Sequence, residues 1–158
     1  MRLDDLNPDQ QRSLLAAAGV ADPPKRKPSA RQDAVDRFAF HTRAYRLPTP
    51  ERELCFAKHI THRTKNGQIR GRQWRFDFAW PAFMVAVEIE GLVVAKLGGR
   101  LVVTGRHATI DGMREDMRKY AVAAELGWYV IRFEQSMVKS AEAIGSTQRV
   151  LTARGWSQ

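Results

Sequence analysis

The chain has 158 residues, which is enough for one domain with a short appendage and too few for two full hydrophobic cores. Its 26 lysines and arginines exceed its 17 acidic residues, so the net charge of +9 favours a polyanion such as nucleic acid as partner, with a basic surface kept for solubility as the alternative. No run approaches the roughly 20 apolar residues of a membrane span, which argues against a membrane protein.

The cysteine content and the first residues bear on the cellular compartment. Cys55 is the single cysteine, which excludes an internal disulfide and a multi-thiolate zinc site built from this chain alone. The segment MRLDDLNPDQQRS lacks the apolar core of a signal peptide. We therefore expect a cytoplasmic protein.

Residues 1–50 predict a helical N-terminal extension. A cap, a proline at the first helical position and a stopping glycine mark a short first helix: Asn7, Pro8 and Gly19. The Pro-rich basic residues 21–30 cannot continue a helix and predict a linker or an arm. Ser29 then caps a second helix that must end before Pro48.

Strands dominate from Glu51 onward. Residues 53–63 predict a strand, Asn66–Gly67 a hairpin turn, and residues 70–80 the returning strand, in which aromatic and charged side chains alternate. Pro81 ends that run. Residues 83–90 then predict a strand that is apolar enough to lie near the centre of a sheet.

The last third of the chain predicts two helices around one strand. A glycine-containing excursion spans residues 91–106, a helix spans 111–127, a strand 128–133, and a helical segment interrupted at Gly145 spans 136–155. The helix at 111–127 carries one apolar stripe: Met113, Met117, Tyr120, Ala121 and Ala124. The order of elements predicts a mixed α/β fold.

Three acidic residues interrupt the predicted strands at 70–80 and 83–90. Strand alternation places Glu88 and Glu90 on one face, and a hairpin folded near Pro81 brings Asp77 across from Glu88. Burying unpaired carboxylates costs several kcal/mol each. We therefore expect either a shared cation, for which oxygen ligands favour Mg²⁺ or Mn²⁺, or salt bridges with nearby arginines.

An ordered set of segments resembles the PD-(D/E)XK nuclease superfamily, and most of all its very-short-patch-repair and small phage-encoded endonucleases. The set comprises Asp77, Glu88 within AVEIEG, GRH at 105–107, and a helix with EDMRKY that leads into LGWYVIRF. The resemblance covers residues 51–140. It implies a restriction-endonuclease-like mixed β-sheet flanked by helices in a nuclease domain at 51–158, and it implies that Asp77, Glu88 and the backbone carbonyl of Ile89 bind Mg²⁺ or Mn²⁺.

The sequence departs from the family at Glu90, which stands where the family carries a catalytic lysine. His107 or Lys119 then becomes the candidate for the cationic catalytic role, with Lys96 ranked third. Lys119 follows Asp116 by three positions, so both reach one edge of the sheet. The alternative for His107 is a structural loop histidine. The alternative for Lys119 is a solvated helix position or a partner of Glu115. Glu90 is expected to support a second ion or to orient the attacking water.

Residues 57–75 contain six basic side chains and no acidic one, which predicts a surface that contacts phosphates. Arg70, Arg72 and Arg75 are expected to hold the nucleic-acid backbone, whereas Trp74 is more typical of a core than of base stacking. The resulting hypothesis is a metal-dependent DNA endonuclease or a structure-selective nuclease, of phage or mobile-element type, and a homodimer would allow both strands to be cut. The alternatives are a catalytically inactive nucleic-acid-binding protein on a nuclease scaffold and a small regulatory protein with a basic arm.

Overall fold

The computed structural model describes residues 29–91, 93–104 and 109–157. Its centre is a four-stranded sheet in the order β1-β4-β5-β8. These strands span Glu51–Cys55, Arg75–Trp80, Val85–Glu90 and Tyr129–Glu134, respectively. β4 pairs antiparallel with β1 and with β5, while β5 and β8 are parallel, so the sheet is mixed.

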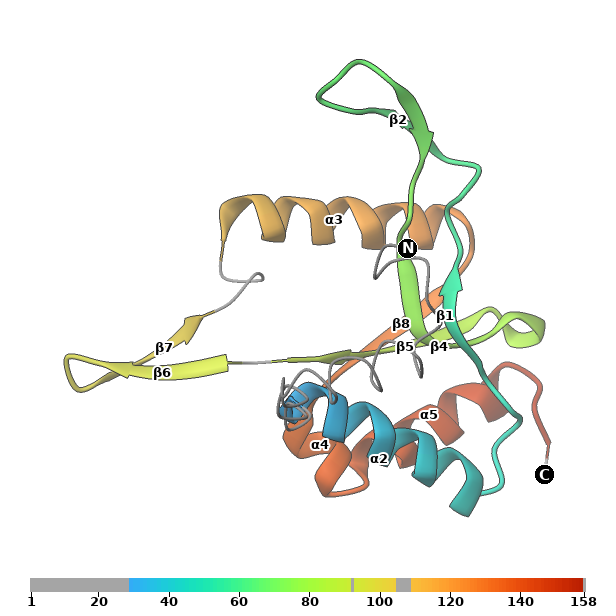
Figure 1. Cartoon of the computed structure of the whole chain (residues 1–158). Coiled ribbons are helices and arrows are strands. Elements are labelled where there is room, and N and C mark those ends of the chain that lie inside the picture. The colour runs from blue at the N-terminus through green and yellow to red at the C-terminus, as the bar shows by residue number, and fades with distance from the viewer. Residues whose placement is uncertain (1–28, 92, 105–108, 158) are drawn as a thin grey trace, which may run out of the picture.

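Helices cover both faces of this sheet (Figure 1). One face carries α2 (Ala30–Ala44), α4 (Gln135–Lys139) and α5 (Glu142–Ala153), and the other carries α3 (Ile110–Glu125). The predicted mixed α/β class, with a mixed sheet flanked by helices, is thereby confirmed. No helix within the described ranges is long and apolar enough to cross a membrane.

The central strand and the predicted helix starts follow from local sequence. Val85, Val87 and Ile89 are at most 1% exposed, and their strand β5 has a partner on each side, which confirms its predicted central place. The hydroxyl of Ser29 accepts a hydrogen bond from the backbone N–H of Gln32 at 3.2 Å, which confirms the predicted cap of α2.

The two long strands predicted at 53–63 and 70–80 are each broken. β1 ends at Cys55, because Phe56 turns inward to stack on Phe76 with their ring centroids 4.0 Å apart. Beyond this turn, β2 (Thr61–Arg63) and β3 (Ile69–Gly71) form a separate hairpin that projects from the body of the protein (Figure 1). The predicted turn at Gly67 is present, with a φ of +78° that suits glycine.

Two further differences lie in the C-terminal half. The excursion after Gly91 contains an antiparallel hairpin, β6 (Val93–Leu97) and β7 (Arg100–Thr104), which no local pattern predicted. The closing helical segment breaks at Ala141 and not at Gly145, because Ala141 adopts a left-handed φ of 62° through which a helix cannot continue.

The predicted apolar stripe of α3 does not face the core. Met113 and Met117 are 48% and 65% exposed, whereas Ala123 is buried in a cluster with Phe76 and Ala86. In Figure 1 the N-terminal half of α3 extends past the sheet, so only the C-terminal half of this helix packs against it.

α2 belongs to the main core. Its residues Ala34, Val35 and Phe38 are buried in one cluster with Phe78 and Phe133 of the sheet. The predicted boundary at residue 50 therefore does not separate this helix from the body of the protein. The predicted first helix, Asn7 to Gly19, lies outside the described residues.

Replacing Phe38 by alanine is expected to lower the free energy of unfolding by about 3 to 5 kcal/mol. Its ring is fully buried, with its centroid 4.8 Å from that of Phe78 and 6.3 Å from that of Phe133. Urea denaturation measures the loss. Phe40→Ala is the matched control on the same helix, because Phe40 is 59% exposed. Equal losses in the two variants would contradict the placement of α2 in the core.

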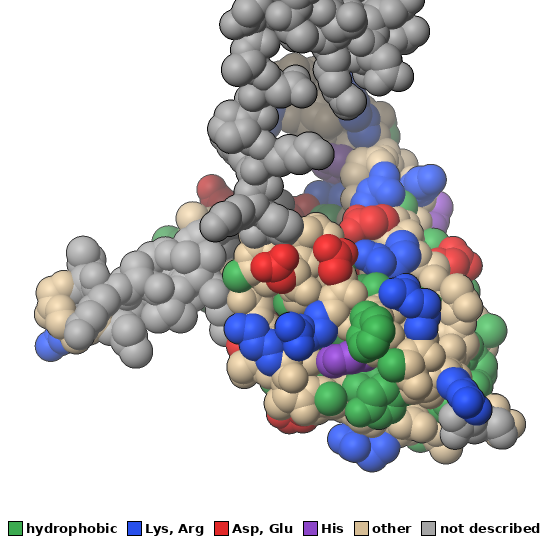
Figure 2. Space-filling model, turned by 60° about the horizontal axis from the view of Figure 1, so that its bottom comes forward, with side chains coloured by type: hydrophobic (Ala, Val, Ile, Leu, Met, Phe, Trp, Pro, Cys, Tyr) green, Lys and Arg blue, Asp and Glu red, His purple; other side chains and the backbone are tan. Residues whose placement is uncertain are grey.

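The face formed by α2, α4 and α5 does not present a uniform positive surface. Figure 2 shows its basic side chains interspersed with acidic and hydrophobic ones. On α2, the ring centroids of Phe40 and Tyr45 lie 6.1 and 6.3 Å from that of His41. The high net charge of the chain is therefore not concentrated on this face.

Candidate functional site

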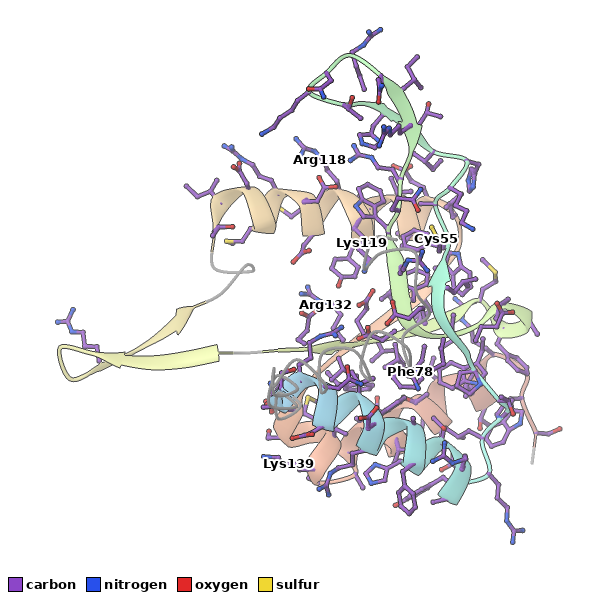
Figure 3. All side chains as sticks on the ribbon, in the orientation of Figure 1. Cys55, Phe78, Arg118, Lys119, Arg132 and Lys139 are labelled. Atoms are coloured by element: carbon purple, nitrogen blue, oxygen red, sulfur yellow. The ribbon has the colours of Figure 1, made fainter. Side chains whose placement is uncertain are left out.

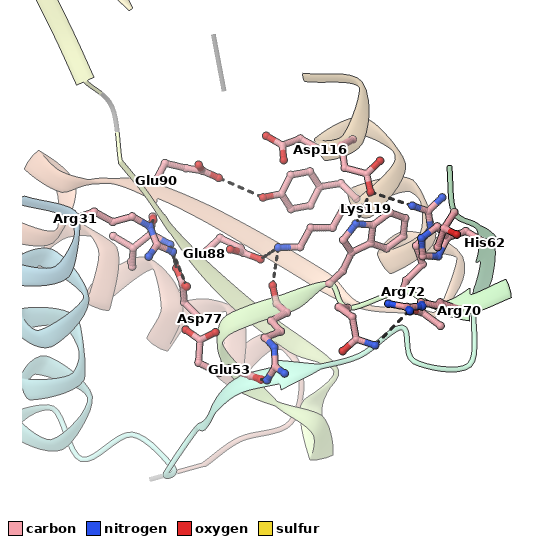
Figure 4. Close-up of a pocket in the computed structure, with 18 residues that line it drawn as sticks. Arg31, Glu53, His62, Arg70, Arg72, Asp77, Glu88, Glu90, Asp116 and Lys119 are labelled. Atoms are coloured by element: carbon pink, nitrogen blue, oxygen red, sulfur yellow. Dashed lines mark hydrogen bonds and ion pairs between the residues drawn. The ribbon is translucent and has the colours of Figure 1, made fainter. Parts of the chain in front are cut away.

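A cavity of about 880 Å³ opens where β4 and β5 lie beneath α3 and beside the β2–β3 hairpin (Figure 4). It brings together the following residues predicted for the site: Arg70, Arg72, Arg75, Asp77, Glu88, Ile89, Glu90 and Lys119. His107 lies outside the described residues, as does the side chain of Lys96. The structure thus collects predicted ligands and predicted phosphate contacts in one place.

Asp77 lies where β4 parts from β5. The paired register ends at Phe78 opposite Val87, so one step further Asp77 lies across from Glu88. There the Asp77 carboxylate accepts the backbone N–H of Ile89 at 2.7 Å, taking the place of a backbone partner. Asp77 is 5% exposed. This arrangement fixes its carboxylate beside the backbone of Ile89.

Arg31 of α2 binds this same pair of residues. Its Nη2 donates to both carboxylate oxygens of Asp77, at 2.7 and 2.9 Å, and its Nε donates to the carbonyl oxygen of Ile89 at 3.0 Å. The guanidinium therefore joins two of the three predicted metal ligands. The sequence analysis missed Arg31, since no local spacing links a residue in the first turn of a helix to a strand 46 positions away.

Glu88 pairs with the predicted lysine. Lys119 of α3 donates to the Glu88 carboxylate and, at 2.6 Å, to the backbone carbonyl of Arg75. The Lys119 and Glu88 side chains are 14% and 9% exposed. Burial raises the pKa of Glu88 to about 7, opposed by the nearby Lys119 cation and reinforced by the negative charges of Asp77 and Glu90. Glu88 thus exchanges a proton near neutral pH.

This pKa predicts a pH-dependent stability. The folded protein binds the Glu88 proton more tightly than the unfolded chain, whose pKa is 4.5, so the contribution is full below pH 4.5 and is lost as the pH rises through about 7. We expect the free energy of unfolding of the wild type to fall by about 3 kcal/mol relative to Glu88→Gln over that range. Urea denaturation in EDTA at several pH values measures it. Parallel pH profiles for the two proteins would refute the assignment.

Glu90 is held beside Glu88 on the same face of β5. Its Oε1 accepts from Nε of Arg132 at 2.8 Å and from the hydroxyl of Tyr120 at 3.2 Å. Burial raises the pKa of Tyr120, so its hydroxyl remains a donor. Each of the three predicted carboxylates therefore has a basic partner, which is the salt-bridge alternative that the sequence left open.

Among the described residues, oxygen donors of the kind that hard divalent cations prefer lie together where Arg31 now binds. Among residues 29–91, 93–104 and 109–157, no three His, Cys, Asp or Glu side chains are grouped as metal ligands. The oxygens of Asp77 and Ile89 nevertheless converge on one cationic group, and carboxylate and carbonyl oxygens are the ligands that Mg²⁺ and Mn²⁺ prefer. The residues thus fit a divalent ion in place of the guanidinium.

The arginines on the opposite wall differ in their partners. Arg72 is fixed, because it pairs with Glu115 at 3.0 Å and lies over the ring of Trp74 at 4.6 Å. Arg70 donates to the Gln68 side-chain amide oxygen at 2.7 Å, and Arg75 donates to a backbone carbonyl at 3.1 Å. Both acceptors are neutral oxygens, so these contacts do not neutralise the positive charge of either arginine. Arg70 and Arg75 are therefore the better suited to bind phosphate.

The sequence analysis did not assign to the site two further residues that line the cavity, His62 and Glu115. His62 of β2 lies opposite Arg70 of β3, and Glu115 receives hydrogen bonds from both Arg72 and Trp74. The Trp74 ring is partly buried against the cluster beneath α3, in line with the predicted core role.

Comparison of the chain with protein-family models, with curated proteins and with solved structures gives no match.

Proposed function

We propose that the chain is a Mg²⁺- or Mn²⁺-dependent endonuclease that hydrolyses phosphodiester bonds of DNA on a restriction-endonuclease-like fold. The observation that carries this proposal is the convergence of the Asp77 carboxylate and the Ile89 carbonyl on one cation position. The Glu88–Lys119 pair lines the same cavity. This arrangement agrees with the resemblance to PD-(D/E)XK nucleases.

Each group has a distinct part in the proposed reaction. Asp77, Glu88 and the Ile89 carbonyl would hold the metal, which when bound would supply an activated water and neutralise charge on the phosphate. Lys119 presents a second positive charge in the cavity, which stabilises the negative charge that develops during hydrolysis. Glu90, fixed by Arg132, is an acceptor that can orient a water.

The basic wall gives the substrate class. Arg70 and Arg75 line the cavity, and among the described side chains no Asp or Glu pairs with either, so a sugar-phosphate backbone can be held against the carboxylates. Such contacts position a nucleic acid without reading its bases. The β2–β3 hairpin, which carries Arg70, adds a two-stranded ribbon of the kind that a major groove admits. Duplex or branched DNA is therefore the proposed substrate.

A second candidate is a nucleic-acid-binding protein without catalysis. The pairing of Asp77 with Arg31, of Glu88 with Lys119 and of Glu90 with Arg132 favours it, because each carboxylate is compensated without a metal. The same arginine wall would then serve binding alone.

Incubating the purified protein with supercoiled plasmid and with branched DNA separates the two candidates. The nuclease proposal predicts nicked or linear products with Mg²⁺ or Mn²⁺ and none with EDTA. Retarded migration of DNA in a gel without cleavage under any of these conditions would favour the binding protein.

A further inference from the structure

Arg31 fills the position that the proposed metal requires. We propose that Arg31 is an internal competitor of the divalent cation, so that metal binds the Asp77 and Ile89 oxygens only after the guanidinium has moved away. The inference rests on the proposed function, because it concerns the metal of that same site. It adds a regulatory contact from α2, a helix outside the region of family resemblance.

The fold provides a specific seat for the Arg31 side chain. A Cβ atom built at Gly91 would lie only 3.2 Å from Cδ and 3.3 Å from Cβ of Arg31, so a larger residue there would crowd the arginine. Upstream, Ser29 caps α2, and downstream Val35 and Phe38 anchor the helix in the core. The backbone that carries Arg31 is therefore fixed relative to the sheet.

The charges make arginine and metal mutually exclusive. Asp77 is 5% exposed and lies near a second carboxylate, Glu88, so it requires a positive partner. The guanidinium of Arg31 brings a full positive charge to these oxygens. A divalent ion on the same oxygens would lie against this permanent cation, and like charges at such short range repel strongly.

A nucleic-acid phosphate offers the Arg31 guanidinium an alternative binding partner to Asp77. The Arg31 side chain is 44% exposed and lines the cavity, so it can swing toward solvent without movement of α2. A phosphate held by Arg70 or Arg75 would present a bidentate acceptor to the freed guanidinium. DNA binding would then release Asp77 and favour metal loading, which would limit cleavage by the free protein.

Mn²⁺ binding measured by titration calorimetry on the full chain without DNA tests the competition. We expect Arg31→Ala to bind Mn²⁺ about tenfold or more tightly than the wild type, because one competing charge-assisted contact is removed. Arg31→Lys, which cannot bridge both oxygens, should fall in between. Arg37→Ala, an exposed arginine of the same helix, should match the wild type.

Thermal unfolding gives a readout independent of activity. In EDTA, Arg31→Ala should melt below the wild type, since Asp77 loses its partner, and Mn²⁺ should raise its melting temperature more than that of the wild type. Adding Asp77→Asn to Arg31→Ala should remove the gain in Mn²⁺ affinity.

The outcomes separate this inference from the proposed function. Equal Mn²⁺ affinity in wild type and Arg31→Ala, with DNA cleavage intact, would overturn the competition and leave the nuclease standing. Absence of Mn²⁺ binding in every variant, Arg31→Lys included, would overturn both. A gain that survives Asp77→Asn would place the metal elsewhere and overturn the role of Arg31.

Discussion

Cleavage of plasmid DNA is expected to fall by about a thousandfold or more when Glu88 is replaced by glutamine or Asp77 by asparagine. Each change removes one negative charge and leaves a side chain of nearly the same shape. Asparagine can still accept the backbone N–H of Ile89, so the parting of β4 and β5 should persist. The loss would thus report on charge at the proposed metal position and not on folding.

The control for this prediction is Glu125→Gln, an exposed acid near the end of α3, which should cleave as the wild type does. Initial rates of plasmid nicking in Mg²⁺ and in Mn²⁺ measure the effect, and urea denaturation reports the stability of each variant. Cleavage retained by Glu88→Gln or Asp77→Asn in a folded protein would place the reaction outside this cavity.

The elements that sequence predicted well begin and end with strong local signals. Ser29 caps α2, and α3 ends just before Gly127, whose φ of +84° lets the chain leave the helix. The short turn that begins at Pro81 returns the chain between β4 and β5, so the expected meeting of Asp77 and Glu88 followed from strand alternation and one turn. Local propensity and tertiary packing agree at these positions.

What the sequence did not predict has both local and tertiary causes. An Asn66–Gly67 two-residue turn would place Arg63 opposite Arg70, but the hydrogen bond from Thr64 N–H to the Gln68 carbonyl makes the loop three residues long and brings His62 there instead. The contact of Arg31 with Asp77, in contrast, is tertiary and joins residues 46 positions apart. The sequence therefore identified the three carboxylates and Lys119, but not Arg31 and Arg132, which pair with Asp77 and Glu90.

Because Glu90 stands where the family carries a catalytic lysine, the resemblance alone does not say which residue supplies the positive charge of the site. The resemblance left the cationic role to residues elsewhere in the chain, and among the described side chains Lys119 reaches Glu88 from α3. Helix spacing could predict that Lys119 and Asp116 share a face, and both line the cavity. Which carboxylate the lysine meets depends on how α3 docks through Ala123, which periodicity alone does not specify.

Replacing Lys119 by methionine is expected to lower DNA cleavage at pH 7 by about a hundredfold, because the cation that would stabilise negative charge near the scissile phosphate is lost. The fold should survive, since Glu88 can take up a proton once its partner is gone. Mn²⁺ binding should also persist, because a divalent ion bound beside Glu88 favours its ionised form, so that chemistry and metal binding separate.

The matched control is Lys139→Ala on α4, which removes the same charge from the opposite side of the sheet (Figure 3) and should leave cleavage unchanged. Equal cleavage by Lys119→Met and wild type would reduce this lysine to a structural partner of Glu88. Loss of Mn²⁺ binding together with cleavage would instead make it a residue that positions the Glu88 carboxylate for the metal. A selective loss of cleavage, with metal affinity and melting temperature retained, is the result that assigns Lys119 to the chemical step.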